Sequence, residues 1–120
     1  MKSITTVLVI VGFLPFLMGA SISLTDTPNP GGNPQQIQGS GTWSVAQGET
    51  ATSIQYQVTL KGSNPPQTTQ STFKPTGNTW SSTLSVAAAT YNPCQVTLYY
   101  TANGMANTFT TKDMNDQVVR

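Results

Sequence analysis

Residues 52–61, TSIQYQVTLK, contain the clearest strand pattern of this 120-residue chain. Apolar side chains occupy every second position in its centre, and polar side chains fill the positions between them. Successive side chains of a β-strand point to opposite faces, so this pattern predicts a strand with one buried and one solvated face. Gln55 and Gln57 belong to the predicted solvent face. The residues expected to face a core are Ile54, Tyr56, Val58 and Leu60.

Further runs with this period of two predict more strands. They lie at residues 41–46, 68–74, 79–86, 94–102 and 106–112. Segments rich in Gly, Pro and Asn separate the runs, as turns require. The strongest turn signal is Asn103-Gly104, because both residues tolerate the positive φ angles of a type I′ turn, and a tight hairpin is expected there. Short strands without a convincing helix predict an all-β chain, an antiparallel β-sandwich of about six or seven strands.

The alternation also assigns single side chains to a face. Trp43 and Trp80 fall on core faces, so their rings are expected in the core. Cys94, the only cysteine, shares a core face with apolar neighbours, which predicts a buried and inert thiol. The alternative for this thiol is a disulfide between two chains in an oxidising compartment. Thr97 and Tyr99 fall on the opposite face and are expected to meet solvent.

Residues 79–101 combine three features in a fixed order. These are a strand with Trp80, Leu84 and Val86, a corner of Ala89, Thr90 and Tyr91, and a strand with Val96 and Leu98. The arrangement resembles the late strands of bacterial immunoglobulin-like or fibronectin type III-like domains of exported proteins, with Ala89 where a Gly is usual. The resemblance implies an immunoglobulin-like sandwich over residues 39–113. It also implies a modular role, as a spacer, adhesin module, appendage subunit or polysaccharide-binding unit.

The N-terminal residues 1–20, MKSITTVLVIVGFLPFLMGA, have the order of a signal peptide, because Lys2 precedes an apolar run that small residues follow. The run is shorter than the roughly 20 residues that cross a bilayer as a helix, so cleavage near Ala20 is expected. The alternative extends the run to Leu24 and keeps it as an uncleaved membrane anchor. Residues 21–38, with three prolines and two glycines, are predicted to be a linker, and residues 114–120 a C-terminal tail.

Composition limits the chemistry. Charged residues make up 8% of the chain and the net charge is +1, too few cations for a nucleic-acid footprint or a polybasic membrane patch. Histidine is absent, which removes the usual base of a nucleophilic triad and, with one cysteine, nearly all zinc, haem and disulfide frameworks. The carboxylates are scattered, at Asp26, Glu49, Asp113 and Asp116, so a two-carboxylate glycosidase site is not expected.

Neither an enzyme nor a bound cofactor is therefore predicted. One alternative is a calcium site at Asp113, Asn115 and Asp116, against the simpler interpretation of these residues as part of a solvated tail.

The expected function is that of a non-enzymatic bacterial module that is secreted, periplasmic or on the cell surface. Its expected partners are other extracellular or surface proteins, or itself as a self-assembling subunit; nucleic acid is not expected, and a membrane only through residues 1–24 if they stay uncleaved. The candidate contact residues are Tyr99, Gln55, Gln57 and Thr97. The alternative is a secreted carbohydrate-binding module, because sugar rings stack on exposed aromatic faces and Tyr99 is expected to be exposed.

Overall fold

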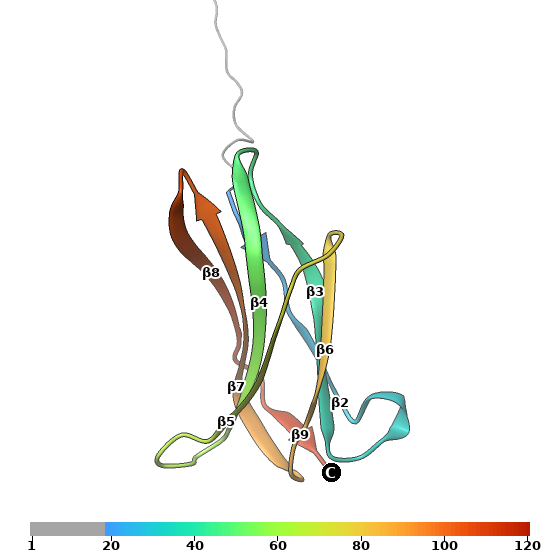
Figure 1. Cartoon of the computed structure of the whole chain (residues 1–120). Helices are drawn as coiled ribbons and strands as arrows, with labels where there is room; N and C mark the ends of the chain where they lie inside the picture. Colours follow the sequence, from blue (N-terminus) through green and yellow to red (C-terminus); the bar gives the residue numbers. More distant parts are fainter. Residues whose placement is uncertain (1–18) are drawn as a thin grey trace, which may run out of the picture.

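The computed structural model describes residues 19–120, and over this range the chain is a sandwich of two antiparallel β-sheets (Figure 1). The signal-peptide prediction falls almost entirely on residues 1–18, outside the described residues. Within the described range the helical structure is one 3-10 turn, η3 (Pro30–Gly32), and no helix there is long and apolar enough to cross a membrane.

The first sheet is built around β3 (Gln36–Ser44). Its partners are β6 (Thr79–Ser85) on one side and, on the other, β1 (Ser21–Ile22) and β2 (Thr25–Pro28). Ser21 pairs with Ser44 and Thr25 with Ser40, so β1 and β2 keep a single register along β3. They form one interrupted edge strand, and we refer to residues 21–28 as the N-terminal strand.

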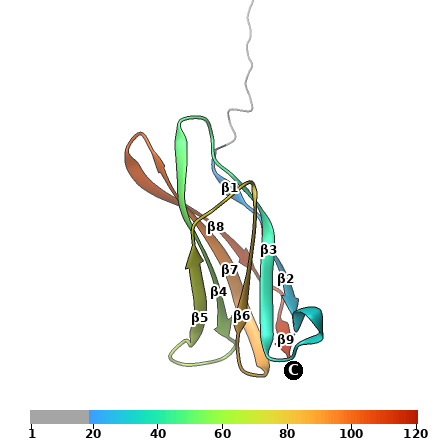
Figure 2. The ribbon, with the colours of Figure 1, turned by 45° about the vertical axis from the view of Figure 1, so that its right-hand side comes forward.

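The second sheet has the order β5-β4-β7-β8. Its strands are β4 (Glu49–Leu60), β5 (Thr68–Phe73), β7 (Ala89–Ala102), β8 (Met105–Asp113) and β9 (Gln117–Val119). The short strand β9 pairs with the first residues of β7, and β8 pairs with the rest. Figure 2 shows the two sheets facing each other, with the β7–β8 hairpin reaching away from the first sheet at its tip.

The core lies between the sheets and confirms the alternation in residues 52–61. Ile54, Tyr56 and Val58 are fully buried, and Leu60 packs against the core while half-buried. Trp80 is buried as predicted, and its indole N–H donates a 2.9 Å hydrogen bond to a backbone carbonyl of the N-terminal strand. The buried apolar residues are Ile22, Ile37, Ile54, Tyr56, Val58, Trp80, Leu84, Val86, Tyr91, Cys94, Val96, Leu98 and Val119.

The prediction of a linker at residues 21–38 is wrong at both ends. The N-terminal strand lies on the sheet edge and buries Ile22, and residues 36–38 begin β3, with Ile37 fully buried in the core. The three prolines and two glycines that favour a linker are confined to residues 28–34, where β2 ends and the chain turns toward β3. Pro28 ends an edge strand, where a missing N–H costs little. The sandwich therefore begins at Ser21 and not at residue 39.

The C-terminal tail predicted at residues 114–120 is also corrected. It contains β9, whose Val119 is only 2% exposed, so the end of the chain is part of the core. The predicted hairpin is confirmed, since Asn103 and Gly104 have φ angles of 54° and 77° and Ala102 pairs with Met105 across them. Trp43 was expected in the core, and it packs against the core while only half-buried.

Candidate interaction surface

The outer face of the β5-β4-β7-β8 sheet is a polar surface that crosses four strands, and its members follow from strand register. Inner positions of β4 hold Ile54, Tyr56 and Val58, so the residues between them point outward together with their cross-strand partners. Along β5 and β4 the outward residues are Thr68, Gln70, Thr72, Ser53, Gln55, Gln57 and Thr59. Along β7 and β8 they are Gln95, Thr97, Tyr99, Thr101, Ala106, Thr108, Thr110 and Lys112. Only Lys112, near one corner, is charged. We call this surface the outer face.

The structure brings the four candidate contact residues together on the outer face. Gln55 pairs directly with Thr97, and Tyr99 lies one pair further along β7. Gln55, Gln57 and Tyr99 are half-buried and accessible to a partner. Thr97 is only 7% exposed, so the expectation that it meets solvent is wrong. The reason is its place in β7, which has β4 on one side and β8 on the other, where its hydroxyl lies 3.4 Å from that of Thr110.

Tyr99 lies across the neighbouring strand. Its hydroxyl donates to Oε1 of Gln55 at 3.5 Å, and Nε2 of Gln55 donates to the hydroxyl of Thr72 at 3.4 Å. Both contacts are long for hydrogen bonds and hence weak. These polar groups can therefore exchange their internal contacts for contacts with a partner at low cost.

A shallow depression of about 760 Å³ lies beside Tyr99. It is next to a β-bulge, where Thr52 is the extra residue between two pairs of the β4–β7 ladder and donates its hydroxyl to the Tyr99 carbonyl at 2.9 Å. The lining residues carry no charge, and they are Thr52, Ser53, Tyr99, Tyr100, Thr101, Ala106, Asn107 and Thr108.

A second polar cluster, which the sequence did not predict, lies between the sheets. Asp26 points inward because it pairs with Gly39, and Asp113 points inward because it pairs with the buried Cys94. The hydroxyl of Tyr56 donates to Oδ1 of Asp26. A Cβ at position 39 would lie 2.6 Å from the Tyr56 ring, so only glycine leaves room for this contact. We call Asp26, Tyr56 and Asp113 the inter-sheet acid cluster.

The electrostatics of the inter-sheet acid cluster follow from the partial burial of Asp26 and the full burial of Tyr56. Desolvation, and then the neighbouring Asp113 carboxyl, raise the pKa of Asp26 to about 7 from an ordinary 3.8. Desolvation also raises the pKa of Tyr56 and of Cys94, whose thiol is fully buried as predicted. Oδ2 of Asp26 is buried and has no other partner, and Oδ1 is held by Tyr56. The cluster joins the two sheets, and Asp26 and Asp113 also line a depression of about 530 Å³ beside the loop between β8 and β9.

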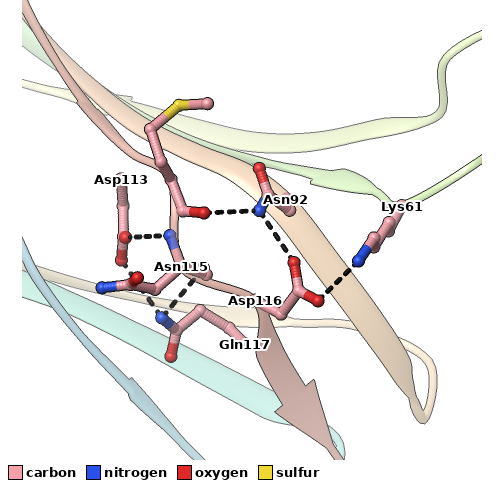
Figure 3. Close-up of polar contacts among 7 residues, drawn as sticks. Lys61, Asn92, Asp113, Asn115, Asp116 and Gln117 are labelled. Carbon is pink, nitrogen blue, oxygen red and sulfur yellow. Dashed lines mark hydrogen bonds and ion pairs between the residues drawn. The ribbon is translucent and has the colours of Figure 1, made fainter.

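The loop between β8 and β9 separates the two carboxylates of the calcium alternative (Figure 3). Asp116 forms an ion pair with Lys61 at 2.5 Å and accepts a hydrogen bond from Asn92 at 2.8 Å. The hydrogen bond and charge of Lys61, together with Asn92, lower the pKa of Asp116. Asp113 instead accepts bonds from the backbone of Asn115 and from the side-chain amide of Gln117. Because the two carboxylates have different partners, their arrangement does not favour a shared calcium ion.

Comparisons of this chain with known proteins identify no relative. No protein-family model matches the chain, and neither the curated proteins nor the solved structures contain a significant match. Within residues 19–120, no group of three His, Cys, Asp or Glu side chains lies close enough together to hold a metal ion.

Proposed function

We propose that this chain is an exported, immunoglobulin-like β-sandwich that acts without catalysis, as a structural or adhesion module. In this proposal it contacts other extracellular or surface proteins through the outer face, on which Gln55, Gln57 and Tyr99 are accessible. The observation that carries the proposal is the chemistry of that face, which crosses four strands with Lys112 as its single charge. A partner can cover such a face without desolvating ions, the largest electrostatic cost of association.

Two observations support the immunoglobulin-like assignment. The strand orders, β2-β3-β6 in one sheet and β5-β4-β7-β8 in the other, require the chain to change sheets between β3 and β4, β5 and β6, and β6 and β7, as Greek-key sandwiches do. The hydroxyl of Tyr91, near the start of β7, donates to the Ala87 carbonyl four residues earlier at 2.9 Å. This is the bond of a tyrosine corner, a hallmark of such domains.

Export is supported by the apolar run that follows Lys2, and by composition. The described surface carries its polarity in Thr, Gln, Ser and Asn side chains, with few charges. The low net charge of +1 also speaks against a nucleic-acid partner.

The test measures adhesion of beads coated with the full chain to intact cells of the producing organism. Gln55→Lys and Gln57→Lys place a charge in the centre of the outer face and are expected to reduce bead retention by about tenfold or more. Thr83→Lys is the matched control, because Thr83 is an exposed residue on the outside of the first sheet. Equal retention of all three variants would overturn the proposal.

A second candidate, a carbohydrate-binding module, is favoured by the depression beside Tyr99. Its volume of about 760 Å³ is in the range of small-ligand sites, and Tyr99 offers an aromatic ring next to hydroxyl groups. Retention of the chain on insoluble polysaccharide, lost in Tyr99→Ala with an unchanged melting temperature, would favour this function. No retention on any member of a glycan panel would exclude it.

A further inference from the structure

The edge strand β8 carries two exposed apolar side chains. It is the last strand of the order β5-β4-β7-β8, and every residue from Asn103 to Thr110 is exposed. Met105 is 70% exposed and Phe109 41% exposed. Figure 2 shows the tip of the β7–β8 hairpin diverging from the first sheet.

The backbone of β8 has a free side in the same place. Residues that flank a two-residue turn exchange both of their backbone hydrogen bonds, and Met105 is such a residue, paired with Ala102. The register between β7 and β8 then continues without a bulge, so bonded positions alternate. Ala106, Thr108 and Thr110 consequently direct their N–H and C=O groups away from β7. No proline or charge blocks this edge between Asn103 and Thr111, although natural edges are usually protected in one of these ways.

We propose that β8 pairs antiparallel with β8 of a second copy of this chain, about a two-fold axis at Asn107. This inference goes beyond the proposed function, because it names a different partner, a second copy of the chain, and a different surface, the free edge of β8. In this register Met105 of each copy lies opposite Phe109 of the other, and Ala106 lies opposite Thr108.

A second copy fits this edge better than an unrelated strand would, because the edge is complementary to itself. A two-fold interface uses the same patch on both subunits, so each exposed apolar side chain must find its match within the patch. Met105 and Phe109 are spaced equally on either side of Asn107 and lie on the same face of β8, so each covers the other. The absence of charge from the segment means that the two copies meet without repulsion.

The free edge of β8 ends just beyond the residues that pair in this register. The hydroxyl of Thr111 donates to the Ile22 carbonyl at 2.5 Å, which ties the next part of β8 to the first sheet. Pairing centred on Asn107 stays between Met105 and Phe109 and clear of this contact. The resulting sheet would run through both copies and join their outer faces into one larger surface.

The register is tested by the rate at which two full-length chains carrying Asn107→Cys form a disulfide with each other. Residues opposite each other in a non-hydrogen-bonded antiparallel pair have Cα atoms about 4.5 Å apart, which a disulfide can span. Cys94 is fully buried and does not compete. In a glutathione redox buffer we expect the dimer to form at least about tenfold faster than in Gln70→Cys, an exposed residue in the middle of the edge strand β5, since pairing raises the effective concentration of the thiols. Equal rates in the two variants would overturn the proposal.

The free edge of β8 is tested by measuring the mass of the full chain in sedimentation velocity experiments at micromolar concentrations. The unmodified chain is expected to be dimeric, and Phe109→Lys monomeric with an unchanged circular dichroism spectrum, while Thr83→Lys stays dimeric. A monomeric unmodified chain overturns edge pairing but leaves the adhesion test of Gln55→Lys in place. Edge pairing would also be overturned if Gln55→Lys dissociates the dimer while Phe109→Lys leaves it intact. That result would show that the two copies meet through the outer face.

Discussion

At the scale of single residues, the Tyr56 ring reaches Asp26 across the core because position 39 is glycine. The ring comes from the second sheet and the carboxyl from the N-terminal strand of the first, so one hydrogen bond joins the two layers. The Asp113 carboxyl completes the cluster from β8. Desolvation of Asp26 is the main reason that its pKa is raised, and the neighbouring Asp113 carboxyl raises it further.

The raised pKa makes stability depend on pH. The pKa of Asp26 is about 7 in the folded chain and near 3.8 when unfolded, so the folded state holds the extra proton between these values. The contribution of Asp26 to stability is therefore fully present below about pH 4, declines as pH rises through about 7, and is level above that. Because Asp26 is only half-buried, we expect the decline to be about 1–2 kcal/mol after solvent screening.

Urea unfolding of the full chain and of Asp26→Asn between pH 4 and pH 8 measures this effect. The asparagine cannot ionise, so its unfolding midpoint should change less with pH than that of the unmodified chain. Two parallel pH profiles would show that Asp26 is not the group responsible.

The sequence predicts part of these residue environments. Alternation alone places Ile54, Tyr56 and Val58 in the core, because period two is a local property of a strand. It does not place Asp26 beside Asp113, since that proximity depends on the register of the N-terminal strand and on how the two sheets pack. The solvent exposure of Thr97 is not predicted for a similar reason. Alternation gives the face of the sheet to which a side chain points, while its exposure depends on the side chains of the neighbouring strands on both sides.

At the scale of elements, the strands that the sequence missed are the short ones at the two ends. Ile22 and Leu24 alternate with serine and threonine, which is a strand signal, but they also continue the apolar run of the N-terminus. The proline and glycine residues that follow then favoured a linker. In β9 the three residues are too few to show a period, and Val119 is buried only because β7 offers it a pairing partner.

The role of β9 can be measured with two neighbouring valines. Val119 is 2% exposed and faces the core, whereas Val118 is 43% exposed on the other side of the same strand. Val119→Ala is expected to lower the free energy of unfolding by about 2 kcal/mol, because it removes two buried methyl groups and leaves a cavity. Val118→Ala is expected to stay within about 0.5 kcal/mol of the unmodified chain. Chemical denaturation distinguishes the two, and equal effects would mean that β9 behaves as the solvated tail that the sequence suggested.

At the scale of the whole molecule, both ends of the described chain help to close the sandwich on the same side. The N-terminal strand contributes Ile22 and Asp26, and the C-terminal segments contribute Asp113 and Val119. The hydroxyl of Thr111 bonds to the Ile22 carbonyl, which ties the two ends directly. On the opposite side, the hydroxyls of Ser71 in β5 and Ser82 in β6 lie 2.6 Å apart and link the other two edges. The sheets are therefore joined along both margins.

This closure predicts where the chain tolerates truncation at its N-terminus. A chain that starts at Ser21, as cleavage after Ala20 would leave it, keeps the whole N-terminal strand and should unfold at the same urea concentration as the full chain. A chain that starts at Asn29 loses the buried Ile22 side chain and leaves the Trp80 indole N–H and the Tyr56 hydroxyl without their partners. The lost burial and the two unpaired polar groups together cost on the order of 4 kcal/mol. A chain that starts at Asn29 and is as stable as the one that starts at Ser21 would contradict the assignment of residues 21–28 to the fold.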